Sequence, residues 1–199
     1  EASKMGMWAF LVTEVLTFAG LFCAYAIFRA WNPEMFISAH KALDVTMGAT
    51  NTVVLITSSL TMALSIRYIQ MNNNRAAIIN LLFTLIFAGT FLVIKYFEYS
   101  HKFHCGQLPG MYYNPHISPD CVSIIGENPH VFFSIYFMMT GLHGLHVIAG
   151  MVLIVWLIIR TSKGHFTSAY YTPVELVGLF WHLVDLIWIF LFPLLYLIG

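Results

Sequence analysis

The stretch VFFSIYFMMTGLHGLHVIAGMVLIVWLII, residues 131–159, decides the fold class of this chain because it contains no Asp, Glu, Lys or Arg. A bilayer core about 30 Å thick is crossed by roughly 20 apolar residues in helical conformation. A segment this long and apolar therefore predicts a transmembrane helix. The strict alternation typical of a membrane β-strand is missing from it, and only helices and closed barrels satisfy the backbone hydrogen bonds in lipid.

Four other segments show the same pattern, and the composition of the whole chain agrees with it. The chain is 59% hydrophobic and only 9% charged, whereas a soluble domain carries about 25% charged residues. The formal net charge is zero, which gives no indication of a nucleic-acid partner. We predict an all-α polytopic membrane protein with one transmembrane domain over residues 1–199, whose five spans cover about 5–28, 43–66, 76–94, 131–159 and 174–198.

The basic residues in the short loops predict the orientation, because cytoplasmic loops carry more Lys and Arg. One side holds Lys4, Arg67, Arg75, Arg160 and Lys163, and the other holds Arg29, Lys41 and Lys102. We therefore place the N-terminus inside and the C-terminus outside. The polar segment of about 98–130 then becomes an outer loop, in which Cys105 and Cys121 either form a disulfide or remain two thiols.

Few ionisable side chains lie inside the predicted spans, and such groups usually face protein rather than lipid. They are Glu14 in the first span, His143 and His146 in the fourth, and His182 and Asp185 in the fifth. A rise of about 1.5 Å per residue puts them in roughly one layer, and residues three apart share a helix face. We expect an interhelical polar network, with Glu14 as a member or neighbour, in which the histidines and Asp185 are structural.

Glu14 leaves two roles open. No basic residue shares its span, and a carboxyl without a positive partner in an apolar layer favours its neutral form. A neutral carboxyl suits either a proton-handling role or a plain hydrogen bond. Gly141, Gly144 and Gly150 flank the histidine pair and are expected to allow close helix approach.

Two functions of other classes remain as alternatives. His143 and His146 lie on one face of one helix and cannot ligate one iron from opposite sides, but His182 with either of them could hold a haem b in an electron-transfer membrane anchor. A small proton-coupled transporter would use Glu14 and Asp185. We expect neither, and no redox centre or metal in this chain.

Several motifs occur in one order along nearly the whole chain. They are KMGMWAFLVTEVLTFAGLFCAY (4–25), NTVVL (51–55), KYFEYSHK (95–102), GLHGLHVIAG (141–150) and WHLVDLIWIFLFPLLYL (181–197). In this series the chain resembles subunit III of the haem-copper terminal oxidases of the cytochrome c oxidase type. The common mitochondrial members have seven helices, and this chain begins at what would be their third, as in the short bacterial forms.

The resemblance implies a subunit without haem or copper, in an oxidoreductase complex of the bacterial cytoplasmic membrane. Such a subunit packs on the catalytic subunit I, beside subunit II, and these partners hold the haems and copper. It binds phospholipid, supports proton uptake and protects the complex during turnover. Glu14 falls on the family's buried carboxylate, which reacts with hydrophobic carbodiimides. A further membrane subunit is expected where the first two helices of longer members would lie.

Four residues on the inner side are candidates for phospholipid headgroups, since interfacial cations suit phosphate. They are Arg75, Arg160, Lys163 and His165. The alternative for each is an ordinary residue of the positive-inside pattern.

Overall fold

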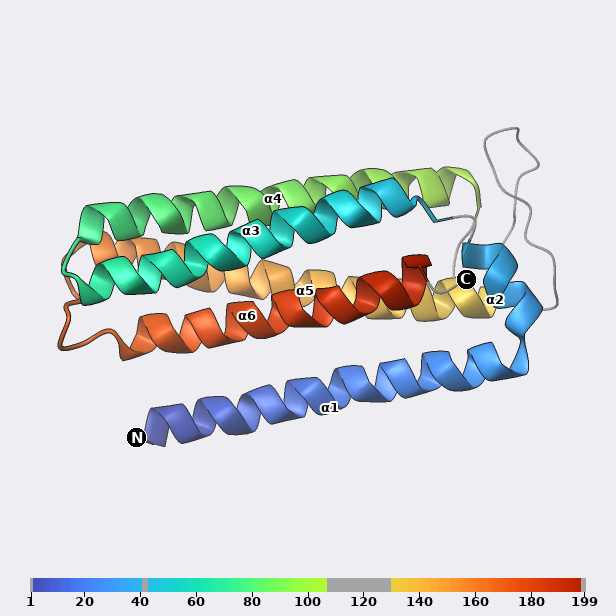
Figure 1. The fold of residues 1–199 in the computed structure, drawn as a ribbon, viewed down its shortest axis with the longest axis horizontal. Coiled ribbons are helices and arrows are strands. Elements are labelled where there is room, and N and C mark those ends of the chain that lie inside the picture. The colour runs from blue at the N-terminus through green and yellow to red at the C-terminus, as the bar shows by residue number, and fades with distance from the viewer. Residues whose placement is uncertain (1, 41–42, 107–129, 198–199) are drawn as a thin grey trace.

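The computed structural model describes residues 2–40, 43–106 and 130–197. Five long helices make up most of these residues (Figure 1), and all five are long and apolar enough to cross a membrane, which confirms the predicted fold class. They are α1 (Ala2–Trp31), α3 (Val45–Gln70), α4 (Asn74–His104), α5 (His130–Ser162) and α6 (Thr172–Phe192). The short helix α2 (Pro33–His40) follows α1, and a π-helical turn (Pro193–Leu197) follows α6.

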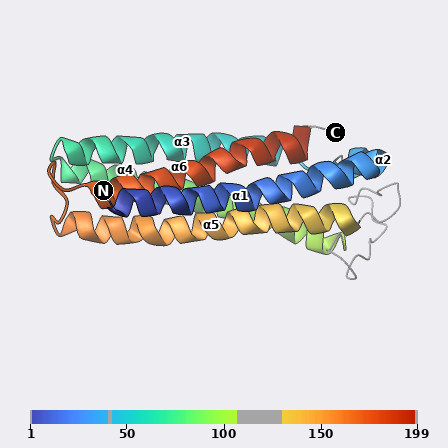
Figure 2. The same ribbon diagram turned by 90° about the horizontal axis from the view of Figure 1, so that it is seen from below.

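Helices α3 to α6 run alternately up and down and pack as a bundle, with α1 laid against α5 and α6 (Figure 2). Helix α6 forms the centre, and its Trp181 and Trp188 are fully buried. The outer faces carry apolar side chains in the open, such as Leu16 of α1, Ile86 of α4 and Val152 of α5. An apolar exterior of this kind matches a lipid surrounding.

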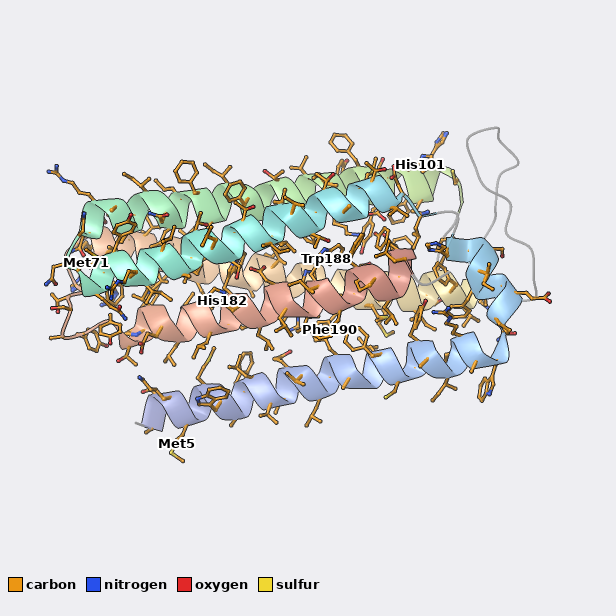
Figure 3. All side chains as sticks on the ribbon, in the orientation of Figure 1. Met5, Met71, His101, His182, Trp188 and Phe190 are labelled. Atoms are coloured by element: carbon orange, nitrogen blue, oxygen red, sulfur yellow. The ribbon has the colours of Figure 1, made fainter. Side chains whose placement is uncertain are left out.

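The two ends of the bundle are marked by Met71 and His101 in Figure 3. At the Met71 end, Asn72 joins two loops, since its Oδ1 accepts from the backbone N–H of Ser168 at 2.8 Å. At the His101 end, Asp44 caps α3, because its Oδ1 accepts from the backbone N–H groups of Thr46 and Met47. This carboxylate satisfies donors that the first helical turn leaves free.

Helix α4 is longer than the sequence predicted. It ends at His104, whereas the predicted span ends at residue 94. Lys95, Glu98 and Lys102 make the last turns look polar, but all three are buried inside the bundle. A charge in an apolar window usually ends a predicted span, and here the charges are taken into the interior by partners on other helices.

The π-helical turn begins at Pro193, which lacks the N–H needed to continue the α-helical ladder. Two carbonyls of this last turn have partners on other elements. The hydroxyl of Tyr25 donates to the carbonyl of Leu194 at 2.8 Å, and Nδ1 of His40 lies 3.4 Å from the carbonyl of Leu195. The turn also brings Tyr196 into the bundle, where it is fully buried.

Candidate functional site

The carboxyl of Glu14 meets an imidazole from another helix. Its Oε2 lies 2.7 Å from Nε2 of His146, so α1 and α5 are joined by this contact. The side chains are only 18% and 17% exposed. The rings of Phe18 and Phe180 lie against the imidazole and form an apolar wall around the pair.

The hydrogen bonds of His146 fix how many protons the pair holds. Nδ1 lies 2.8 Å from the carbonyl oxygen of Leu142, which can only accept, so Nδ1 carries a hydrogen. The contact between Nε2 and Glu14 then needs one further proton, placed either on the carboxyl or on the ring. A neutral pair and an ion pair are therefore two states of one shared proton, and neither leaves an unpaired charge.

His143 faces a different part of the bundle from His146. It is fully buried, and neither ring nitrogen has a hydrogen-bond partner among the described residues. Its ring packs on the edge of Phe91 of α4 and against Trp188 of α6. Three residues along a helix turn the side chain by about 60°, which is enough to send the two histidines to different neighbours.

His182 and Asp185 lie along the side of α6 that runs beside α3. The hydroxyl of Ser59 lies 2.6 Å from Nδ1 of His182. The carboxyl of Asp185 is buried close to the same Ser59 hydroxyl, although neither of its oxygens makes a hydrogen bond of full geometry within the described ranges. The five predicted polar residues therefore do not join into one hydrogen-bonded network there. Glu14 pairs with His146, and the other three residues lie elsewhere in the bundle.

A second polar cluster lies near the His101 end and was not among the predicted site residues. Lys95 donates to Oε2 of Glu98 at 2.8 Å and to the hydroxyl of Tyr196 at 2.7 Å. The hydroxyls of Tyr136 and Tyr196 both donate to Oε1 of Glu98. The ammonium also lies 4.6 Å from the ring centre of Trp188, a cation–π contact. Each charge thus has several partners.

The sequence held one signal for this cluster. Lys95 and Glu98 are three apart, so on a continued helix they share a face and can pair. The tyrosines could not be found in the same way, because Tyr136 and Tyr196 are separated from Glu98 by 38 and 98 residues. Only the tertiary packing, which sets Tyr136 of α5 and Tyr196 of the π-helical turn beside α4, brings them together.

The four headgroup candidates lie at the Met71 end. Arg75 lies in the first turn of α4, Arg160 lies in the last turn of α5, and Lys163 and His165 lie in the loop before α6; all four are exposed. The guanidinium of Arg160 lies 5.4 Å from the ring centre of Trp156. Lys4 lies at the same end, where its Nζ is 3.2 Å from Oε2 of Glu175.

The predicted cysteine pair is placed only in part. Cys105 is buried at the end of α4, with its Sγ 3.9 Å from Nε2 of His101, whereas Cys121 lies outside the described residues. Within the described ranges, no group of three or more His, Cys, Asp or Glu side chains is placed to hold a metal ion.

We expect the Cys105–Cys121 bond to form in the oxidising outer compartment. Peptide mapping of chain purified with a thiol-blocking reagent should give one linked peptide pair that separates on reduction. Cys23, an exposed free thiol of α1, is the internal control and should be blocked in every sample. Blocked Cys105 and Cys121 in unreduced protein would contradict the pairing.

Comparison with known proteins places the chain in a family. The sequence profile described as "Cytochrome c oxidase subunit III" matches residues 1–106 and 122–199. The "Cytochrome c oxidase subunit 3" of Synechocystis sp. is 32% identical over 203 residues, which cover 100% of this chain and 76% of that protein. The "Cytochrome bo(3) ubiquinol oxidase subunit 3" of Pseudomonas putida is 27% identical over 203 residues, covering 100% of this chain and 87% of that protein.

A longer relative has a name that joins two subunits. The "Heme-copper oxidase subunit I+III" of Aeropyrum pernix is 29% identical over 202 residues, which cover 98% of this chain but only 22% of that protein. The profile match extends over nearly the whole length of this chain and includes all five of the long helices. The chain therefore belongs to the cytochrome c oxidase subunit III family.

Proposed function

We propose that this chain is the non-redox subunit III of an aerobic terminal oxidase and associates with the catalytic haem-copper subunit. The observation that carries the proposal is the family match over residues 1–106 and 122–199. Relatives named as oxidase subunit 3 and the relative named subunit I+III support an association with subunit I. The proposed complex also contains subunit II and lies in the bacterial cytoplasmic membrane. Its haems and copper are held by the partner chains.

The test is mass spectrometry of the chains that co-purify with this one from native membranes in mild detergent. A haem-copper catalytic subunit in fixed ratio is the expected result. The other co-purifying chains would include the subunit that binds the electron donor. They would also include any membrane subunit that occupies the place of the first two helices of longer family members. Isolation of this chain alone, or with an unrelated dehydrogenase, would overturn the proposal.

The Glu14–His146 pair is the proposed proton-handling group of this subunit. By helix rise, Glu14 lies ~18 Å from the start of α1, and His146 lies ~24 Å from the end of α5. The pair is thus well inside the membrane, at a place where a proton can shift between carboxyl and imidazole without leaving an unpaired charge. This property supports a role in proton supply to the catalytic subunit.

Glu14→Gln should abolish labelling of this chain by a hydrophobic carbodiimide, which reacts with carboxyls but not with amides. The amide of Gln can still donate to Nε2 of His146, so assembly of the complex should change by less than ~1 kcal/mol. Labelled peptides would be quantified by mass spectrometry. Glu175→Gln is the matched control and should keep full labelling; undiminished labelling of Glu14→Gln would place the reactive carboxyl elsewhere.

We further propose that the Met71 end faces the cytoplasm and binds phospholipid headgroups through Arg75, Arg160, Lys163 and His165. Each interfacial cation contributes about 1 kcal/mol toward an anionic lipid surface. Arg160→Gln should therefore weaken retention of anionic phospholipid by roughly fivefold, measured as lipid phosphorus in the purified complex. Arg29→Gln, at the opposite end, should retain the normal amount; equal losses from the two variants would count against headgroup binding at Arg160.

A further inference from the structure

A cavity of about 350 Å³ lies between α1, α3 and α6 near the Met71 end, and we call it the Met71-end cavity. Its charged lining is the pair of Lys4 and Glu175, whose side chains are 56% and 28% exposed. The imidazole of His182 lines it as well. The remaining walls are apolar and consist of Trp8, Ile66, Leu176 and Leu179. The cavity has room for several water molecules, each of which takes about 30 Å³ in the liquid.

His182 lies deeper in the membrane than the charged residues of this cavity. It follows Glu175 by seven residues, so it is ~10 Å farther along α6 on the same helix face. Measured from Thr172, where α6 begins, the imidazole is ~15 Å into the span. Figure 3 shows His182 between the Met71 end and Trp188. The Met71-end cavity therefore connects surface charges with an imidazole well inside the membrane.

Two further polar groups lie behind the imidazole. Nδ1 of His182 is 2.6 Å from the hydroxyl of Ser59. The same hydroxyl lies close to the carboxyl of Asp185, which is only 3% exposed. Among the described residues, the ring of His182 bonds through Nδ1 alone. Nε2 is therefore left for the cavity that the ring lines, and the order of groups inward from it is imidazole, hydroxyl and carboxyl.

Asp185 is the group of this series that holds a proton. Within the described ranges the Ser59 hydroxyl is its polar neighbour, and no cation pairs with it. A charged carboxylate is unfavourable inside a membrane, and burial without a positive partner favours the neutral carboxyl. The carboxyl makes no hydrogen bond of full geometry as it stands, so a small rotation of the side chain is needed to bring its O–H onto the oxygen of Ser59.

The hydroxyl of Ser59 can pass a proton because it both donates and accepts. In one arrangement the neutral carboxyl donates to Ser59, Ser59 donates to Nδ1, and the ring carries its hydrogen on Nε2. A shift of the carboxyl hydrogen to Ser59, and of the Ser59 hydrogen to Nδ1, gives a carboxylate and an imidazolium. Release of the Nε2 hydrogen to water in the Met71-end cavity then completes the transfer. Only O–H and N–H bonds change, and the proton count is conserved at each step.

The other side of this series is closed to water. Ser59, His182 and Asp185 also line a groove between α3 and α6 on the outside of the bundle. The rest of its lining is apolar and consists of Ile56, Leu60, Ala63, Leu186 and Ile189. Such walls face the hydrocarbon region of a bilayer, which contains no water to accept a proton. The Met71-end cavity is thus the side from which the imidazole can exchange a proton.

We propose that Asp185 is a proton-binding site that exchanges its proton with the aqueous phase at the Met71 end, through Ser59, His182 and the Met71-end cavity. This role is separate from that of the Glu14–His146 pair, and it goes beyond the structural role that the sequence predicted for Asp185 and His182. Side chains of this chain alone form the series. Its failure would therefore leave the proposed function standing.

Infrared difference spectroscopy on the assembly that co-purifies with this chain tests the site. A neutral carboxyl has a C=O stretching band that a carboxylate lacks, so the spectrum of Asp185→Asn should have lost one such band. In D₂O this band should shift as the carboxyl exchanges its hydrogen. Absence of any lost band would mean that Asp185 holds no proton and would overturn the proposal, whichever subunits co-purify.

Two variants of Ser59 test the transfer itself. Ser59→Ala should slow the exchange of the Asp185 band by roughly a hundredfold, the lower end of what a positioned proton-transfer group contributes. Ser59→Thr keeps the hydroxyl and should exchange within a few-fold of wild type. Equal rates in Ser59→Ala and wild type would show that the hydroxyl is not on the path, and the proposal would be wrong.

Two tryptophan variants test the route. Leu179→Trp places a large side chain in the wall of the Met71-end cavity and should slow the exchange several-fold. Leu60→Trp makes the same change in the α3–α6 groove and is the matched control, with an expected rate equal to wild type. Amide hydrogen exchange of the whole chain should be the same in both variants, which would show that the fold is kept. Slower exchange in Leu60→Trp, or unchanged exchange in Leu179→Trp, would contradict entry through the Met71-end cavity.

Discussion

Lys95→Met should destabilise the folded chain by about 3–5 kcal/mol, which is the usual penalty for leaving one member of a buried ion pair alone. The substitution keeps the length of the side chain but removes the ammonium that contacts Glu98, Tyr196 and the ring of Trp188. Glu98 would remain inside the bundle with the two tyrosine hydroxyls as its donors among the described residues, and with Lys102 as the remaining positive charge nearby. The measurement is the free energy of unfolding in lipid–detergent micelles titrated with SDS, followed by tryptophan fluorescence.

A double-mutant cycle separates the pair from its surroundings. Lys95→Met with Glu98→Gln removes both charges, so the double variant should be more stable than Lys95→Met alone. Lys4→Met breaks the pair with Glu175, whose side chains are 56% and 28% exposed, and it should cost less than ~1 kcal/mol. Equal losses from Lys95→Met and Lys4→Met would show that burial of the inner pair has little energetic consequence.

The membrane spans could be predicted because each one repeats the same local signal. Residues 131–159 contain no charge, and the structure gives α5 as His130–Ser162. The same reasoning stopped the third span at 94, ten residues before the observed end of α4. Hydropathy judges each residue without its partners, and Lys95 and Glu98 are tolerated only through contacts with residues far along the chain.

The candidate site could be predicted in residue type but not in pairing. Glu14 stood out because it has no basic residue in its own span, yet its partner is His146, 132 residues later. A spacing of three residues predicted one helix face and one structural role for His143 and His146. In the bundle, His143 packs between Phe91 and Trp188, while His146 faces α1. Which neighbour each side chain meets depends on the rotation of α5 against three other helices.

The glycines of α5 show the same limit. Gly141, Gly144 and Gly150 were all expected to allow close helix approach. Only Gly150 does so, since a Cβ atom there would lie 2.6 Å from two ring carbons of Trp181. At Gly144 an added Cβ would meet nothing within 4 Å, and at Gly141 its nearest neighbour would be the hydroxyl of Tyr99 at 4.0 Å. Spacing along the sequence cannot tell which of the three faces the partner helix.

Gly150→Ala should therefore destabilise the bundle by about 1–3 kcal/mol, the usual penalty for overpacking a core. The ring of Trp181 has no free space to move into, because it is fully buried and its Nε1 donates to Oγ of Ser58 at 3.0 Å. The new methyl group must push α5 away from α6, or move the ring and break that bond at a further loss of about 1 kcal/mol. SDS titration in lipid–detergent micelles would measure the difference.

Gly144→Ala is the matched control for this prediction, since it makes the same change on the same helix at a site with open space. Alanine favours the helix by up to about 1 kcal/mol relative to glycine, so this variant should be as stable as the wild type or slightly more so. A loss at Gly144 equal to that at Gly150 would mean that the backbone, not the contact with Trp181, sets the effect. Opposite signs at the two sites would instead identify the α5–α6 approach at Gly150 as the contact that fixes the rotation of α5, and with it the directions of His143 and His146.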